Sequence, residues 1–288
     1  MTMNLAKVKL FALIGDPIEQ SLSPAMHNAA FRALGLNCAY VALRVPERSL
    51  ADAIGGVRAL GIAGFNITIP HKIDIISLLD GLDESASLVG AVNTVKNDRG
   101  KLIGFNTDGE GALRALEGKI GSVKGKEAVL LGAGGAARAI AFSLARAGAR
   151  LTIANRTVPK ARALASTIEQ KLGIDVEVIT IDRAELTEAL KNADALINAT
   201  SIGMYPRGDQ TLVSASMMHR GLIVNDIVYK PLRTRLLREA RRVGGRTIDG
   251  LGMLVHQGAL AFEIWTGKRA PIKVMETAAK RQLRGESK

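Results

Sequence analysis

A glycine-rich segment between an apolar strand and an alanine-rich helix constrains the fold of this chain more than any other feature. Residues 128–131 (AVLL) are typical of a buried strand and run directly into GAGGAAR at 132–138. Gly132 permits a tight turn, Gly134 lets backbone approach a pyrophosphate, and Ala137 keeps the next helix close to the strand. The segment therefore favours a dinucleotide-binding strand–helix unit over a tight connection that binds nothing.

Short apolar strands alternate with helices along the rest of the chain, which is typical of a mostly parallel α/β sheet. The first series of predicted strands covers 10–14, 40–45 and 65–69 and ends in an antiparallel ribbon with a turn at 97–100. The second series begins after Asp108 and covers 128–131, 151–154, 176–181, 195–198 and 222–228. Since 288 residues exceed the usual single-domain size, we predict two domains around a shared cleft.

Composition excludes several classes of protein. No charge-free apolar run approaches the roughly 18 residues of a membrane span, and the N-terminal segment lacks a signal-peptide pattern. The single cysteine, Cys38, cannot form an internal disulfide, and the histidines show no metal-ligand spacing. We expect a cytoplasmic protein that binds neither membranes nor a metal ion.

The net charge of +12 raises the question of nucleic acid. Much of the excess lies on one predicted helix with an inner face of Leu232, Leu236, Leu237 and Ala240. Its outer face carries Arg233, Arg235, Arg238, Arg241, Arg242 and Arg246. Only 3% of the residues are aromatic, so few side chains are available to stack on bases. We expect a solvated helix face and no nucleic-acid partner, although a nucleic-acid patch is the alternative.

The residues after the second strand of the dinucleotide series predict which nicotinamide cofactor binds. An acidic residue there would bond the ribose 2′-hydroxyl of NAD, but the chain reads Asn155-Arg156-Thr157 with Lys160 nearby. Two cations, an amide and a hydroxyl suit a 2′-phosphate and hence NADP. The alternative is a basic surface loop in which Thr157 caps the following helix.

Polar residues follow the first predicted strand of the first series. Ser21 and Ser23 precede Pro24 and an apolar-periodic helix, so Ser23 is predicted to be the helix N-cap with Pro24 at the first helical position. The helix N-terminus and the two hydroxyls together would also hold a carboxylate.

Further polar residues lie where later strands end, the edge at which α/β proteins bind ligands. Asn66 and Thr68 alternate with apolar neighbours and share one face of a strand, and Lys72 follows one turn later. Lys72 is either a solvated charge or the partner of Asp108 in a buried ion pair. Its neighbour His71 is predicted to be structural.

The chain resembles the shikimate dehydrogenase family nearly end to end. The resemblance rests on GDPIEQSLSPAMHNAAF, GFNITIPHK, GAVNTV, GFNTDGEG, GAGGAARA, ANRT, NATSIGM, DIVY and DGLGMLVHQGALAFEIWTG. It implies a mixed, mostly parallel α/β substrate domain at 1–107, completed by helices within 250–288. It also implies a Rossmann-like, doubly wound NADP-binding domain at 108–249, with the cleft between the two. The implied reaction is the reversible NADPH-dependent reduction of 3-dehydroshikimate to shikimate in aromatic amino-acid (chorismate) biosynthesis.

The family pattern also implies a role for particular residues. The catalytic residues would be Lys72 and Asp108. Both would also contact substrate, together with Ser21, Ser23, Asn66, Thr68, Asn93, Tyr229 and Gln257. NADP(H) would be bound by Gly132, Ala133, Gly134, Gly135, Ala136, Asn155, Arg156, Thr157, Lys160, Thr200, Ile227 and Gly250. Many family members carry arginine where this chain has Lys160, so the preference for NADP over NAD is expected to be weaker here.

Two rival interpretations stay open at the level of the sequence. One is a quinate/shikimate dehydrogenase of the same family that uses NAD; the missing acid near Asn155 argues against it. The other is a non-catalytic dinucleotide sensor that could bind nucleic acid through the arginine helix, but a sensor would have no use for Lys72 and Asp108. We expect a small-molecule substrate, shikimate or 3-dehydroshikimate, as the partner, and a monomer or a homodimer.

Overall fold

A computed structural model describes residues 4–285, which divide into two compact units. Unit 1 contains the residues up to Thr107 and those from Val255 onward, and unit 2 contains Asp108–Leu254. The second crossing thus lies inside helix α9 (Gly250–Thr266) and follows Leu254, whereas the sequence prediction ended the second domain at residue 249.

Unit 1 is built on a mixed six-stranded sheet with strand order β2-β1-β3-β5-β6-β4. The strands are β1 (Lys9–Gly15), β2 (Cys38–Arg44), β3 (Gly64–Ile67), β4 (Gly81–Leu82), β5 (Thr94–Asp98) and β6 (Lys101–Phe105). The pairs β1–β2, β1–β3 and β4–β6 are parallel, whereas β5 runs antiparallel to both β3 and β6. The predicted antiparallel ribbon at the end of this series is therefore confirmed.

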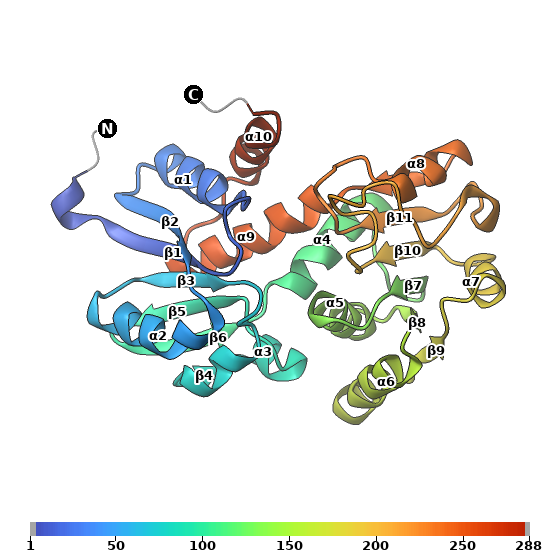
Figure 1. Ribbon diagram of the computed structural model, residues 1–288, viewed down its shortest axis with the longest axis horizontal. Helices are drawn as coiled ribbons and strands as arrows, with labels where there is room; N and C mark the ends of the chain where they lie inside the picture. Colours follow the sequence, from blue (N-terminus) through green and yellow to red (C-terminus); the bar gives the residue numbers. More distant parts are fainter. Residues whose placement is uncertain (1–3, 286–288) are drawn as a thin grey trace. The chain divides into compact units, whose positions relative to one another are not determined.

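Helices cover both faces of the unit 1 sheet, with α1 and α2 on opposite sides (Figure 1). The helices are α1 (Ser23–Ala33), α2 (Leu50–Ala59), α3 (Glu84–Val89), the later part of α9, and α10 (Ile272–Leu283). Three short 3₁₀ helices complete the unit at Leu5–Lys7, Glu47–Ser49 and Asp74–Leu78. Apolar residues of α2 pack on Ile14 and Phe65, and on the other face Phe31 of α1 contacts Phe11 and Phe262. The later part of helix α9 is thus packed against α1 within unit 1.

Unit 2 is a doubly wound parallel sheet with strand order β12-β11-β10-β7-β8-β9. Its strands are β7 (Glu127–Leu131), β8 (Arg150–Ala154), β9 (Glu177–Ile179), β10 (Ala195–Asn198), β11 (Ile223–Asp226) and β12 (Arg246–Ile248). The order reverses between β7 and β10, and ligands of such sheets bind at the carboxyl ends of the strands beside that reversal. The GAGGAAR segment begins at that point, directly after β7.

Two helical layers enclose the unit 2 sheet. The helices are α4 (Asp108–Ile120), α5 (Gly135–Arg146), α6 (Val158–Leu172), α7 (Arg183–Leu190) and α8 (Arg235–Arg242), with a 3₁₀ turn at Ala215–Met217. Leu186 and Leu190 of α7 and Leu237 of α8 pack on the face that carries Val129 and Val224. Helices α6 and α8 lie on opposite sides of the sheet (Figure 1).

The predicted arginine helix is shorter in the structure than in the sequence prediction. Helix α8 begins at Arg235, after Arg233, and ends at Arg242, whereas Arg246 opens strand β12. The prediction was wrong for Arg246 because Gly244, with φ of 76°, lets the chain reverse into the strand.

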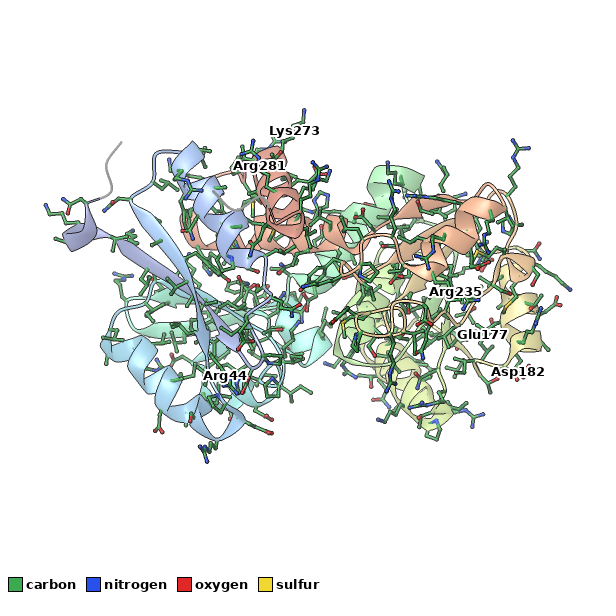
Figure 2. The ribbon with its side chains drawn as sticks, turned by 45° about the horizontal axis from the view of Figure 1, so that its top comes forward. Arg44, Glu177, Asp182, Arg235, Lys273 and Arg281 are labelled. Atoms are coloured by element: carbon green, nitrogen blue, oxygen red, sulfur yellow. The ribbon has the colours of Figure 1, made fainter. Side chains whose placement is uncertain are left out.

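The positive charge is spread over the surfaces of both units. Figure 2 shows Arg235 on α8, Arg44 on β2, and Lys273 and Arg281 on α10, and all four residues have exposed or partly exposed side chains.

Candidate active site

The turn after β7 can be made only by glycine. Gly132 has φ of 110°, and a Cβ there would lie 3.1 Å from Thr200 Cγ2 and 3.2 Å from the carbonyl oxygen of Ala199. The turn is therefore packed directly against the loop that follows β10.

The next residues leave room for a bulky anion. A Cβ at Gly134 or Gly135 would meet nothing within 4 Å, and Ala137 is fully buried against the sheet. Helix α5 begins at Gly135, and its N-cap residue, Gly134, provides no side-chain cap. The first N–H groups of α5 thus remain as donors, so this cradle fits the pyrophosphate of a dinucleotide.

The loop after β8 holds the cationic residues predicted to bind a 2′-phosphate. The Asn155 side chain donates to the carbonyl of Thr157 at 2.8 Å, which fixes the loop. Thr157 occupies the N-cap position of α6, but its hydroxyl makes no capping hydrogen bond, contrary to the alternative interpretation of this residue. Arg156 and Lys160 are exposed, and no carboxylate within residues 4–285 forms an ion pair with either. The side chains of Arg156, Thr157 and Lys160 therefore remain available to one phosphate.

The loops after β10 and β11 complete the carboxyl edge of unit 2. The Thr200 hydroxyl donates to Asn198 Oδ1 at 2.7 Å, and Ile227 and Tyr229 are half-buried. A Cβ at Gly250 would lie 2.2 Å from the carbonyl oxygen of Ile227, so only glycine allows α9 to begin there. Burial raises the pKa of Tyr229, which keeps its hydroxyl protonated as a donor.

In unit 1 the serine pair differs from the prediction. Helix α1 starts at Ser23 itself, and its N-cap residue, Leu22, makes no side-chain cap. Ser21 Oγ accepts the N–H of Ser23 at 3.2 Å, so Ser21 satisfies the first N–H of the helix. Ser23 is buried, and its hydroxyl hydrogen-bonds that of Tyr40 and opposes the rise that burial causes in the pKa of Tyr40. The prediction that Ser23 is the N-cap was wrong because its side chain points into the core.

Asn66 is held in a buried network on one face of the unit 1 sheet. Its Nδ2 donates to the carbonyl of Asn93 at 3.1 Å and to Thr94 Oγ1 at 2.9 Å. Its Oδ1 accepts the Tyr40 hydroxyl at 2.7 Å. Both amide protons of Asn66 are therefore already used within the protein.

Asn93 extends the same network to the chain after β6 and to α9. Its Oδ1 accepts the N–H of Thr107 at 2.8 Å, and its Nδ2 donates to Thr107 Oγ1 at 2.9 Å and to Gln257 Oε1 at 3.3 Å. The structure thus brings the predicted substrate residues Asn66, Asn93 and Gln257 together within unit 1.

Lys72 and His71 follow β3 and differ in burial. Lys72 is half-buried, and its carbonyl accepts the N–H of Val92 at 2.7 Å. His71 is fully buried, with Nε2 2.7 Å from the carbonyl oxygen of Val45, which fits the structural role predicted for it. Thr68 directly follows β3 and lies so close to β1 that a Cβ at Gly15 would be 2.3 Å from its methyl group. Asp108 is the buried first residue of α4 in unit 2.

None of the helices within residues 4–285 is long and apolar enough to cross a membrane. The same residues contain no group of three or more metal-ligating side chains.

This fold and site define a dinucleotide-binding α/β protein of the Rossmann type. Residues 13–95 match the shikimate dehydrogenase substrate-binding domain, residues 114–228 match shikimate/quinate 5-dehydrogenase, and residues 250–280 match the shikimate 5′-dehydrogenase C-terminal domain. The chain belongs to the shikimate dehydrogenase family.

Individual relatives are similar over nearly the whole chain. The shikimate dehydrogenase (NADP(+)) of Methanopyrus kandleri is 53% identical over 282 residues, which cover 97% of this chain and 97% of the relative. A crystal structure of shikimate dehydrogenase in complex with NADP+ has a TM-score of 0.93 and 51% identity, and the match covers 98% of this chain and 97% of that one. The Thermus thermophilus enzyme in complex with NADP(H) and shikimate has a TM-score of 0.86 and 39% identity, over 94% of this chain and 98% of that one.

Proposed function

We propose that this protein is an NADP-dependent shikimate dehydrogenase. It reduces the ring ketone of 3-dehydroshikimate to the hydroxyl of shikimate, reversibly, in aromatic amino-acid (chorismate) biosynthesis. The observation that carries the proposal is the cationic loop after β8, with Arg156, Thr157 and Lys160 available beside a glycine turn shaped for a dinucleotide. The enzyme is cytoplasmic and acts on a small molecule as a monomer or a homodimer.

Bound NADPH supplies the hydride for the reduction. The positive charge of Lys72 stabilises the negative charge that develops on the ketone oxygen. The hydride alone would leave an alkoxide, so one proton is also added to that oxygen, delivered by the Lys72 ammonium or by water. Asp108 is the second catalytic residue.

The remaining residues bind and orient the substrate. The Ser21 and Ser23 hydroxyls hold the carboxylate, with Thr68 and the Tyr229 hydroxyl nearby. Asn93 and Gln257, already joined by a hydrogen bond, hold ring hydroxyls. Asn66 acts on the same part of the site and holds Asn93 and Thr94 in place.

The reaction is tested by following absorbance at the NADPH band in the oxidative direction. We expect turnover with shikimate and NADP+, slower turnover with NAD+, and little with quinate. Turnover confined to quinate with NAD+ would instead assign the chain to the quinate/shikimate branch. Dinucleotide binding without turnover on either acid would make it a sensor.

Replacing Arg156 by alanine is expected to lower kcat/KM for NADPH at least tenfold and to leave activity with NADH nearly unchanged. A charge-assisted hydrogen bond contributes about 1.5–3 kcal/mol, which corresponds to that factor or more. Steady-state kinetics with both cofactors measure the effect. Arg162→Ala, which removes another exposed arginine, on α6, serves as the control and should keep the parental ratio of kcat/KM for NADPH to that for NADH. Equal losses with NADPH and NADH in Arg156→Ala would rule out the phosphate clamp.

Replacing Ser21 by alanine is expected to raise KM for shikimate about tenfold, with kcat within about threefold of the parent. Because Ser21 also accepts the Ser23 N–H, the variant should lose up to about 1 kcal/mol of stability. Asp182→Ala is the matched control (Figure 2), since Asp182 accepts the N–H of Ala184 at 2.8 Å and caps α7 in unit 2. The control should lose similar stability without any change in KM. An unchanged KM in Ser21→Ala would leave Ser21 as a helix cap only.

A further inference from the structure

A buried carboxylate lies at the carboxyl edge of the unit 2 sheet. Asp226 is the last residue of β11 and is 0% exposed. Its Oδ2 accepts the Thr234 hydroxyl at 2.6 Å, and its Oδ1 accepts Asn198 Nδ2 at 2.9 Å and the N–H of Val228 at 3.1 Å. In the part of the chain that the structure describes, no lysine or arginine pairs with it.

The three donors come from separate segments of unit 2. Asn198 ends β10, Val228 lies in the loop after β11, and Thr234 is the N-cap residue of α8. Asp226 therefore ties together the two loops that carry Thr200 and Tyr229.

Asn198, which hydrogen-bonds Asp226, also hydrogen-bonds Thr200. Asn198 Oδ1 accepts both the N–H of Thr200, at 3.1 Å, and its hydroxyl, at 2.7 Å. Asn198 Nδ2 donates to the carbonyl of Ile202 at 3.2 Å as well as to Asp226. The loop at 199–202 is thus folded around the side-chain amide of Asn198, and the hydrogen bond to Asp226 fixes the orientation of that amide.

The same loop packs against the dinucleotide turn. Thr200 Cγ2 and the Ala199 carbonyl oxygen lie so close to Gly132 that a Cβ there would approach them to 3.1 and 3.2 Å. The second loop contains Ile227, whose carbonyl oxygen limits residue 250 to glycine. Moving either loop would change the outline of the cofactor site.

A stabilising role alone does not account for a charge in this position. Burial raises the pKa of the Asp226 carboxyl, and the hydrogen bonds from Thr234, Val228 and Asn198 oppose that rise. Burying a carboxylate without a cation is costly, and a well-packed apolar residue is often at least as stable. Three convergent donors on one carboxylate do, however, fix three segments at once, which an apolar residue cannot do.

We propose that Asp226 is a positioning residue of the cofactor site, holding the 199–202 loop and the 227–229 loop in the arrangement that binds the nicotinamide cofactor. The proposal rests on the proposed function, since it concerns the same cofactor. Asp226 acts through Asn198, Thr200 and Val228.

The test compares Asp226→Asn with a control at the opposite end of a neighbouring strand. Asparagine keeps the shape of Asp226 but replaces one acceptor oxygen by an NH2 group that faces the donors. The control is Asp194→Asn: Asp194 precedes β10 and accepts Lys126 Nζ at 3.0 Å and the N–H of Glu127 at 2.9 Å. Both variants lose buried or half-buried hydrogen bonds, but only the first lies beside the cofactor loops.

NADPH binding is measured by fluorescence titration without substrate, and hydrogen exchange is followed at the amides of 199–203 and 227–229. We expect Asp226→Asn to raise the NADPH dissociation constant at least tenfold, equivalent to about 1.4 kcal/mol. Its amides in both loops should exchange faster than in the parent. Asp194→Asn should bind NADPH within twofold of the parent, even with an equal loss of thermal stability. An NADPH dissociation constant within twofold of the parent in Asp226→Asn would overturn the proposal and leave Asp226 as a structural residue.

A second pair of variants, at Thr234, tests the positioning role of Asp226 if Asp226→Asn does not fold. Thr234→Val removes the 2.6 Å donor and keeps the carboxylate, whereas Thr234→Ser keeps the hydroxyl. We expect weaker NADPH binding and faster loop exchange in the valine variant and parental values in the serine variant; equal NADPH binding by the two would overturn the proposal. If the parent itself fails to bind NADPH, the proposed function is wrong, but the exchange comparison still tests whether Asp226 holds the loops.

Discussion

Replacing Lys72 by methionine is expected to lower kcat for shikimate oxidation by about 10²–10⁴-fold, the range that acid–base and electrostatic side chains usually supply. Methionine keeps most of the apolar stem of the half-buried lysine and removes only the charge. Because Lys72 acts on charge that develops in the transition state, the dissociation constant for NADPH should stay within about twofold of the parent.

Steady-state kinetics at saturating shikimate and NADP+ measure this loss. Lys101→Met, at an exposed lysine on β6 of the same unit, is the matched control and should keep the parental kcat. A kcat for Lys72→Met within about threefold of the parent would exclude Lys72 from the chemistry.

The dinucleotide half of the site could be predicted from sequence because its signals are local. Gly132 needs its left-handed φ, and Gly134 and Gly135 leave the space that the pattern implies. Each of these requirements is met within one strand–turn–helix unit, so a short window of sequence contains it. The first and last residues of most strands were also predictable to within a few positions, because short apolar runs mark buried strands.

Short strands and the end of the arginine helix were not predictable in the same way. Strand β4 has two residues and β12 has three, too few to show a period. Arg246 fits the spacing of a helical face, and only the backbone reversal at Gly244 places it in a strand. In both cases the conformation depends on pairing with a neighbouring strand, β6 for β4 and β11 for β12, and the local sequence pattern does not show that pairing.

The roles of buried polar residues depend on contacts between distant segments. The Ser-Pro pair predicted an N-cap at Ser23, but the buried Ser23 hydroxyl hydrogen-bonds Tyr40 of β2, and Ser21 Oγ accepts the first N–H of α1. Asp226 was not singled out, although Asn225-Asp226 at the end of an otherwise apolar strand was a visible signal. Sequence shows that such residues are polar, but only the fold shows which donors converge on them.

His27 is a further residue that sequence could not interpret. It is fully buried in α1, stacked on Tyr40 with ring centroids 4.5 Å apart and 5.2 Å from the ring of Trp265. Neither ring nitrogen has a hydrogen-bond partner within residues 4–285. Burial lowers the pKa of His27 from 6.5 to about 3, so the imidazole stays neutral in the folded protein throughout the mildly acidic range.

This shift makes the folded protein sensitive to acid. Below pH 6.5 the unfolded chain binds a proton at His27 that the folded chain does not bind until about pH 3. The contribution of neutral His27 to the free energy of unfolding is therefore fully present above pH 6.5. Between pH 6.5 and about pH 3 it falls by about 1.4 kcal/mol for each pH unit.

Replacing His27 by leucine, an apolar residue of similar size, is expected to remove this sensitivity. Between pH 8 and pH 5 the parent should lose about 2 kcal/mol of unfolding free energy through His27, and His27→Leu should lose about that much less over the same interval. Urea denaturation at several pH values, followed by the fluorescence of the single tryptophan in unit 1, measures the difference. His219→Gln, which leaves His27 in place, should keep the parental pH dependence. If the stability of His27→Leu falls as steeply as that of the parent, the buried imidazole is not the group that makes the fold acid-labile.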